Sequence, residues 1–209
     1  ARVKSISARL ERVRRQRTQN RKSRLKAVLP TVALVGYTNA GKSSLFNRLT
    51  ESNVYAADKP FATLDPILRK LQLKRFGPML LGDTVGFVRD LPHHLIEAFK
   101  ATLEEAAYAD LLIHVIDASS EAPLQDLKII EKELLDYGFN LIDRPRIIAL
   151  NKTELLTKDR QQDLLDQFIQ VTSEKVLLIS AATNFGIPPL LSEVWQLLEN
   201  KKTFYSSDD

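Results

Sequence analysis

The sequence has 209 residues, enough for one complete domain of about 150 residues and an appendage. Hydrophobic residues make up 44% and charged residues 27%, as in ordinary globular chains, which excludes wholesale disorder. The absence of cysteine excludes a disulfide framework, a thiolate metal site and a cysteine nucleophile, and a content of only 3 histidines argues against a zinc enzyme. No apolar run approaches the ~18 residues of a membrane-spanning helix and no signal-peptide pattern follows Ala1, so we expect a cytoplasmic chain, or a piece cut from one, without a membrane span.

The net charge of +4 is unevenly distributed. Residues 1–26 carry eleven basic side chains and one acidic one, which gives them +10 and leaves −6 for residues 27–209. Apolar residues recur here at helical spacing, so we expect residues 1–29 to form a basic helical arm with one narrow apolar stripe. Such a charge indicates a polyanionic partner; the alternative is a solvated helix whose charges bind nothing.

After Pro30 the sequence alternates short apolar segments with amphipathic ones. In chain order we expect a strand at 32–35, a helix at 43–50, strands at 67–73 and 79–81, a helix at 95–108, a strand at 111–116, a helix at 124–137, a strand at 146–150, a helix at 159–171, a strand at 176–179 and a helix at 189–199. Strands that are apolar on both faces and alternate with helices indicate an α/β fold, with a mostly parallel sheet and helices on both faces. The alternation of apolar and polar residues at 67–73 favours an edge strand, which we expect to be antiparallel. Residues 30–200 would form this domain, and residues 201–209 a flexible tail.

One segment matches the phosphate-binding pattern G-x-x-x-x-G-K-[ST] in full. It consists of Gly36, Tyr37, Thr38, Asn39, Ala40, Gly41, Lys42 and Ser43, with Ser44 after it. It lies between an expected strand and an expected helix, which is the context that the pattern requires. Its two glycines allow several backbone N–H groups to face one phosphate, Lys42 would reach the β- and γ-phosphates, and the Ser43 hydroxyl would hold Mg²⁺. The segment therefore predicts that the chain binds a nucleoside triphosphate.

Three further polar segments each follow an expected strand. They are Asp83, Thr84, Val85 and Gly86; Asn151, Lys152, Thr153 and Glu154; and Ser180, Ala181 and Ala182. The carboxyl ends of parallel strands are where α/β proteins bind ligands, so we expect the Asp83 carboxylate in the Mg²⁺ shell and the Gly86 amide facing the γ-phosphate. Each segment alone is more often a turn than a site, but four motifs in this order indicate a nucleotide-binding switch.

This order of motifs resembles the GTPases of the translation-factor class, and the match to the HflX family of ribosome-associated GTPases is closer still. The phosphate loop carries the likeness together with residues 83–87 and 91–93, residues 9–13 and 98–104, and Phe61, Ala62, Thr63, Leu64 and Asp65. The likeness covers residues 1–200 and implies a P-loop GTPase G domain, preceded by the end of a linker helix.

The resemblance also implies roles for individual residues. Thr63 and Ser43 would bind Mg²⁺ directly, and Asp83 mostly through water. Asn151 and Glu154 would read guanine, Lys152 would cover the plane of the base, and the Ala181 amide would meet its O6 atom. The residues closest to the reaction would be Lys42, Thr63, Gly86 and Asn39.

For the whole protein the resemblance implies GTP and GDP as ligands, Mg²⁺ as cofactor, and the large ribosomal subunit with its RNA as partner. The biological act would be the splitting or rescue of stalled ribosomes, and we expect a monomer. The alternative is a nucleotide-gated module that binds RNA or the ribosome and hydrolyses GTP only incidentally. A third interpretation, an ATPase, is disfavoured by the base-reading motif, although Glu154 at the end of that motif weakens the argument against it.

The sequence departs from the pattern of this class at two positions. The base-reading motif ends in Glu154 instead of aspartate, which keeps the carboxylate but adds a methylene. Phe87 stands where many such GTPases have a water-orienting glutamine, so we expect slow hydrolysis that a partner stimulates. Asn39 either helps to bind a potassium ion against the phosphates or stabilises the turn of the loop. His114, in an apolar strand, is expected to be a core histidine with satisfied hydrogen bonds.

Overall fold

The computed structural model describes residues 29–51, 67–73, 77–83, 109–138 and 141–205. The chain divides into two compact units, Ala1–Pro30 and Thr31–Asp209, and the first lies almost wholly outside the described residues. The basic arm and the helix expected at 95–108 therefore remain predictions.

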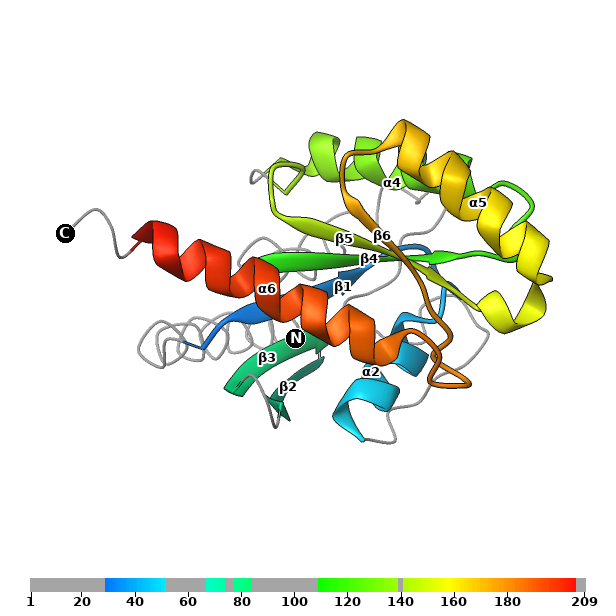
Figure 1. Ribbon diagram of the computed structural model, residues 1–209. Helices are drawn as coiled ribbons and strands as arrows, with labels where there is room; N and C mark the ends of the chain where they lie inside the picture. The colour runs from blue at the N-terminus through cyan, green and yellow to red at the C-terminus, as the bar shows by residue number, and fades with distance from the viewer. Residues whose placement is uncertain (1–28, 52–66, 74–76, 84–108, 139–140, 206–209) are drawn as a thin grey trace, which may run out of the picture. The chain divides into compact units, whose positions relative to one another are not determined.

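Six strands form a single sheet in the order β2-β3-β1-β4-β5-β6 (Figure 1). Their bounds are Thr31–Val35 (β1), Ile67–Leu73 (β2), Gly77–Asp83 (β3), Leu111–Asp117 (β4), Arg146–Asn151 (β5) and Lys175–Leu178 (β6). All neighbours pair in parallel except β2 and β3, which are antiparallel and place Ile67 opposite Asp83. The sheet confirms the expected α/β fold, including the antiparallel edge strand at residues 67–73.

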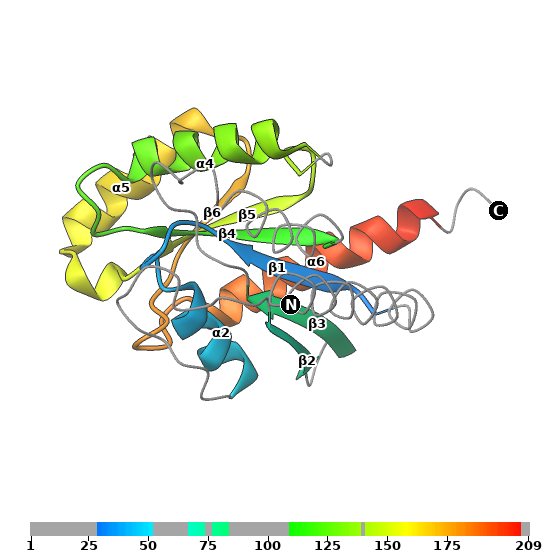
Figure 2. The ribbon, with the colours of Figure 1, turned by 180° about the vertical axis from the view of Figure 1, so that it is seen from behind.

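The two faces of the sheet are covered by different helices (Figures 1 and 2). The helices are α2 (Lys42–Thr50), α4 (Pro123–Tyr137), α5 (Lys158–Val171) and α6 (Ile187–Tyr205), with a 3₁₀ turn η2 (Thr153–Leu155). One core holds residues of α2 and α6 such as Phe46, and the opposite face has cores that hold residues of α4 and α5 such as Phe168. Both phenylalanines are fully buried, and each burial is worth about 1.5–3 kcal/mol. Strands β4 and β5 are apolar on both faces because each face meets a helical layer.

The C-terminal helix is longer than the sequence pattern predicts. We expected a helix at 189–199 and a flexible tail from 201, whereas α6 runs from Ile187 to Tyr205. Residues 201–205 thus belong to the helix, and residues 206–209 lie outside the described residues. No glycine or proline follows Pro189, and lysines close to a helix C-terminus interact favourably with its dipole, so nothing in the sequence ends the helix at 200. Among the described residues, no helix is long and apolar enough to cross a membrane.

Candidate functional site

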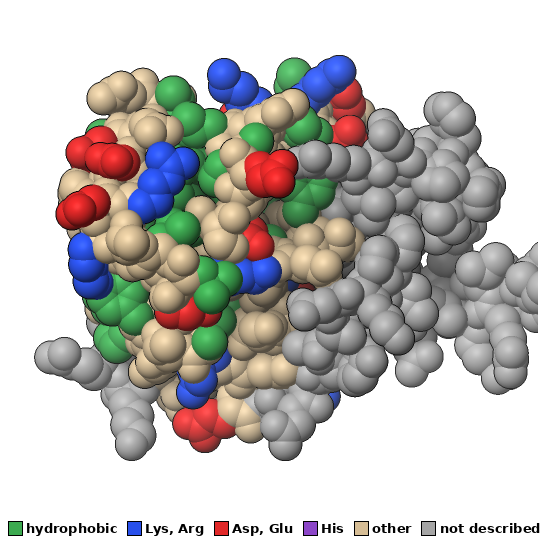
Figure 3. All heavy atoms as spheres, turned by 90° about the vertical axis from the view of Figure 1, so that its right-hand side faces the viewer, with side chains coloured by type: hydrophobic (Ala, Val, Ile, Leu, Met, Phe, Trp, Pro, Cys, Tyr) green, Lys and Arg blue, Asp and Glu red, His purple; other side chains and the backbone are tan. Residues whose placement is uncertain are grey.

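The predicted site residues gather where the parallel strands end. Asp83 is the last residue of β3 and Asn151 the last residue of β5, and the phosphate loop begins directly after β1. Figure 3 looks onto this side of the molecule and shows a hollow in which acidic and basic side chains lie close together. The topology thus brings together segments that are more than a hundred residues apart in the sequence.

The phosphate loop follows a path that two of its glycines allow. Gly36 has φ +145°, and a Cβ there would lie 2.2 Å from the Val115 carbonyl oxygen of β4. Gly41, the N-cap of α2, has φ +91°, and a Cβ there would lie 2.2 Å from Nδ2 of Asn151. Asn39 is exposed and also left-handed, with φ +63°, a conformation that asparagine adopts more readily than most residues. The loop can therefore lie directly against β4 and Asn151.

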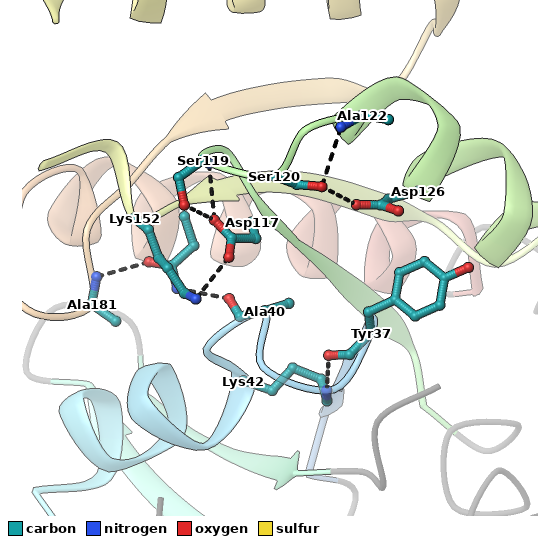
Figure 4. Close-up of polar contacts among 11 residues, drawn as sticks. Tyr37, Ala40, Lys42, Asp117, Ser119, Ser120, Ala122, Asp126, Lys152 and Ala181 are labelled. Atoms are coloured by element: carbon teal, nitrogen blue, oxygen red, sulfur yellow. Dashed lines mark hydrogen bonds and ion pairs between the residues drawn. The ribbon is translucent and has the colours of Figure 1, made fainter. Parts of the chain in front are cut away.

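Lys42 is buried and is held by the loop itself (Figure 4). Its Nζ donates hydrogen bonds to the carbonyl oxygens of Gly36 at 3.0 Å and Tyr37 at 2.6 Å. Burial lowers the pKa of Lys42 to about 8, although the nearby charge of Asp83 acts in the opposite direction. A cation that is desolvated in this way interacts strongly with an incoming phosphate, because little water has to be displaced from it.

Ser43 and Asp83 provide oxygen atoms of the kind that Mg²⁺ prefers. The Ser43 hydroxyl donates to Oδ2 of Asp83 at 2.7 Å, so the first turn of α2 and the end of β3 meet. A hydroxyl and a carboxylate beside a phosphate site form a typical Mg²⁺ donor set. In the described part of the chain, no group of three or more His, Cys, Asp or Glu side chains could hold another metal ion. The donor set therefore fits Mg²⁺.

On the other side of the loop, Asn151 links three segments. It is 2% exposed; its Nδ2 donates to the Ala40 carbonyl oxygen at 2.9 Å, and its Oδ1 accepts from the Ala181 amide at 3.0 Å. Asn151 thus connects β5 to the phosphate loop and to the loop after β6. The predicted base-reading residues lie on these connected loops.

The rest of the base-reading motif is held by hydrogen bonds at Thr153 and is exposed to solvent at Glu154. The Thr153 hydroxyl donates to the Ile179 carbonyl oxygen at 2.9 Å, whereas Glu154 is exposed. Ser180 is fully buried, and its hydroxyl accepts from the Thr183 amide at 3.0 Å. The Ala182 carbonyl oxygen accepts from Arg48 at 2.7 Å.

Sequence reasoning missed Asp117 and Arg48. Asp117 ends β4 directly opposite Asn151, and its Oδ2 lies 2.7 Å from Nζ of Lys152 (Figure 4). Its position at the end of a buried strand, which it shares with Asp83 and Asn151, was a signal that could have identified it. Arg48, on α2, also donates to the Ala181 carbonyl oxygen at 2.9 Å, and nothing in its local sequence indicated this contact.

His114 is a core residue, but it is not satisfied as expected. It lines a cavity of about 400 Å³ between the phosphate loop and β4, together with Tyr37, Thr38 and Asp117. It is 1% exposed, and neither ring nitrogen has a hydrogen-bond partner among the residues that the structure describes. Its neighbours across the sheet are Val35 and Ile148, which offer no polar side chain. Burial, with smaller effects of two nearby cations, lowers the pKa of His114 to about 3, so the ring is neutral.

Several predicted site residues lie outside the described residues. They are Phe61, Ala62, Thr63, Leu64, Asp65, Thr84, Val85, Gly86 and Phe87. Their roles in Mg²⁺ and γ-phosphate binding stay predictions. Ser44 is described and lies exposed on the first turn of α2.

A family model and two relatives all indicate a GTPase. Residues 31–152 match the family model described as "50S ribosome-binding GTPase". The chain is 46% identical over 200 residues to "GTPase HflX" of Escherichia coli (strain K12), covering 96% of this chain and 46% of that protein. It is 45% identical over 193 residues to "GTPase HflX" of Caldanaerobacter subterraneus, covering 92% and 42%. The chain thus spans somewhat less than half the length of these relatives.

A solved structure agrees at the level of the fold. The GTP-binding protein from Sulfolobus solfataricus in complex with GDP superposes with a TM-score of 0.66 and 28% identity, over 95% of this chain and 61% of that one. In that complex the ligand is GDP.

Proposed function

Because this chain belongs to the family of 50S ribosome-binding GTPases and, within it, to the HflX group, we propose that it binds GTP with Mg²⁺ and hydrolyses it to GDP and phosphate. Its fold is that of a P-loop GTPase G domain. The observation that carries the proposal is the position of Asn151, whose side chain contacts both the phosphate loop and the Ala181 amide. One nucleotide can therefore reach the phosphate loop and the base-reading loops at the same time.

On the phosphate side, Lys42 and backbone N–H groups would bind the phosphates. The first N–H groups of α2 have no partner within the helix, so they and the helix dipole favour an anion at this position. Lys42 would exchange its two loop carbonyl partners for phosphate oxygens and stabilise the charge that develops on them. Ser43, Asp83 and Thr63 would hold Mg²⁺, which neutralises phosphate charge when bound.

On the base side, guanine would be read by a carboxylate and an amide. Glu154 would accept from N1–H and the 2-amino group together, a pair of donors that adenine does not have. The Ala181 amide, which donates to Oδ1 of Asn151 in the structure, would exchange this acceptor for O6, and the Lys152 stem would cover the plane of the base. Losing such paired contacts costs several kcal/mol, which corresponds to roughly 10³-fold discrimination or more.

Nucleotide competition and turnover test this proposal. GTP should displace a fluorescent GDP analogue from the full chain at far lower concentration than ATP. Phosphate release should require Mg²⁺ and should be lost in Lys42→Met. Equal competition by ATP and GTP would contradict the proposal.

We further propose that the protein acts in the cytoplasm as a monomer on the large ribosomal subunit, and that its hydrolysis cycle serves to split or rescue stalled ribosomes. Phe87 cannot orient a water molecule, which supports slow intrinsic turnover and acceleration by the ribosome. Turnover should rise when purified large subunits are added and should respond less to small subunits. If the protein binds ribosomes in its GTP-bound state and its turnover does not rise, it is instead a nucleotide-gated binding module.

The basic arm supports a contact with ribosomal RNA. Each phosphate that a basic side chain neutralises releases counterions, so binding should weaken steeply with salt. Replacing Arg12, Arg14, Arg15 and Arg17 by glutamine should reduce the salt dependence of ribosome binding and leave the affinity for GDP unchanged. An unchanged salt dependence would show that these four charges do not contact RNA.

One experiment distinguishes the two alternative roles of Asn39, in potassium binding or in the turn of the loop. Its left-handed backbone supports the role in the turn, and its carboxamide oxygen is a suitable ligand for potassium. Turnover should be compared in potassium and in sodium at equal ionic strength. A potassium advantage that Asn39→Ala removes would support the cation role, whereas equal rates in both salts would support the turn.

A further inference from the structure

The ion pair between Asp117 and Lys152 connects β4 to the base-reading motif. Nζ of Lys152 lies 2.7 Å from Oδ2 of Asp117, and both side chains are about three-quarters buried, with exposed fractions of 26% and 24%. Lys152 has a left-handed backbone, with φ +65°, at the start of the turn that carries Glu154. The ammonium group is therefore drawn back toward the end of β4.

Asp117 is itself firmly held. Its second oxygen, Oδ1, accepts from the Ser119 amide at 2.9 Å and from the Ser119 hydroxyl at 2.6 Å. The Ala118 amide donates to the Asn151 carbonyl oxygen at 2.8 Å, which fastens the end of β4 to the end of β5. The carboxylate is thus fixed before any ligand arrives, so Asp117 loses little further freedom by pairing with Lys152.

The Glu154 carboxylate, unlike that of Asp117, is not held in place. It is exposed, and it makes no hydrogen bond or ion pair in the described part of the chain. It stands two residues after Lys152, and its side chain is one methylene longer than the aspartate usual at this position. A lysine has a flexible four-carbon stem, so a lysine without another partner can pair with a carboxylate on its own loop.

We propose that Asp117 is a specificity-determining positioning residue, which keeps the Lys152 ammonium away from Glu154 and so leaves the Glu154 carboxylate to the N1–H and 2-amino donors of guanine. This inference rests on the proposed guanine binding. Without Asp117, Lys152 and Glu154 pair with each other, and the base then has to compete with an internal cation for its acceptor. The lysine also moves from its position beside the base.

Inosine diphosphate tests this role because it lacks only the 2-amino group of GDP. Loss of one hydrogen bond to a carboxylate should weaken binding to the unsubstituted chain by about ten- to a hundredfold. In Asp117→Asn the ratio of the two dissociation constants should fall below about threefold, because Glu154 no longer reads the 2-amino group freely. Titration calorimetry with the full chain and Mg²⁺ measures both constants.

A second substitution separates this role from simple support of the fold. In Asp117→Asn/Lys152→Met the competing cation is gone, so the ratio should return to within about twofold of its original value, even though both nucleotides bind more weakly. A protein damaged only in its folding would not recover in this way. Ser119→Ala, which removes one of the two donors to Oδ1 of Asp117, should lower the ratio about two- to threefold and is a milder variant in case Asp117→Asn does not fold.

Asp126→Asn is the matched control. Asp126 accepts from the Ser120 hydroxyl at 2.7 Å, in the same loop region, and the structure gives it no contact with Lys152. Its substitution should leave the ratio unchanged. An unchanged ratio in Asp117→Asn, a failure of Lys152→Met to restore it, or equal binding of GDP and inosine diphosphate by the unsubstituted chain would each overturn the inference. Equal binding of ADP and GDP would instead overturn the proposed function itself.

Discussion

The phosphate side and the base side of the site are constructed differently. On the phosphate side the chain uses backbone, with Gly36 against β4 and two loop carbonyl groups that hold Lys42. On the base side it uses side chains that bind one another, such as Asp117 with Lys152. A backbone packed against backbone cannot yield, whereas a side chain can rotate. We therefore expect substitutions on the phosphate side to affect folding and affinity, and those on the base side to affect selectivity.

The largest effect should come from Gly36→Ala. The new Cβ would lie 2.2 Å from the Val115 carbonyl oxygen in the middle of the sheet, and the residue would keep φ +145°. We expect the free energy of unfolding to fall by about 3 kcal/mol or more, measured by urea denaturation. Gly138→Ala is the control, because Gly138 also has a positive φ of +80° but no atom within 4 Å of its Cβ position. Equal losses in the two variants would mean that only backbone strain matters at Gly36.

Gly41→Ala lies at the boundary between the two sides and should affect binding more than folding. The atom it meets is Nδ2 of Asn151, at 2.2 Å, and this side chain can move. Moving it breaks its contacts with Ala40 and Ala181, so the affinity for GDP should fall about a hundredfold.

A double-mutant cycle checks the cause of that loss. If Gly41→Ala acts through Asn151, then adding Asn151→Ala to it should weaken GDP binding little further. Fully additive losses would show that the two positions act independently.

The difference between the two sides also explains which parts of the site could be predicted from the sequence. The phosphate side follows from a contiguous motif with a fixed backbone path, so Gly36, Gly41 and Lys42 could be identified from spacing alone. The alternation of strands and helices predicted the parallel sheet, because buried parallel strands are apolar on both faces. Both are local signals. The parallel sheet is confirmed in the described part of the chain, and the nucleotide-binding roles of the loop residues stay predictions.

Long-range contacts were not predictable in the same way. Asp117 and Lys152 are 35 residues apart, and only the parallel register of β4 and β5 brings them together. We expected hydrogen bonds for His114 because buried polar groups usually have them. Whether a partner exists depends on the neighbouring strands, and the residues opposite His114 there are apolar. The length of α6 was missed because the sequence contains no signal that ends it.

Lys42 should give the phosphate side a pH dependence. Its pKa in the free protein is about 8, so the side chain is charged below pH 8 and loses its proton above it. Bound phosphate favours the charged form, so binding takes up a proton above pH 8 and the affinity for GDP falls by up to about tenfold per pH unit. The free energy of unfolding changes with pH in the opposite direction. The unfolded chain keeps this proton up to about pH 10.4, so the contribution of Lys42 to the free energy of unfolding rises between the two pKa values.

Calorimetry from pH 7 to pH 9 measures this dependence of affinity. Lys42→Arg should remove it, because a guanidinium stays charged throughout this range. A slope that persists in Lys42→Arg would assign the titration to another group.

The smallest effect should come from Glu154→Asp on the base side. Glu154 is exposed and unpaired, so shortening it disturbs no contact in the described part of the chain. Aspartate has one fewer rotatable bond to order when it binds the base, and we expect GDP to bind about twofold tighter. The affinity for ADP should not change, because adenine offers no pair of donors to either carboxylate. If GDP instead binds more weakly to Glu154→Asp, the longer side chain is needed to reach the base, and the loops of this site hold the nucleotide farther from the motif than in GTPases that carry aspartate here.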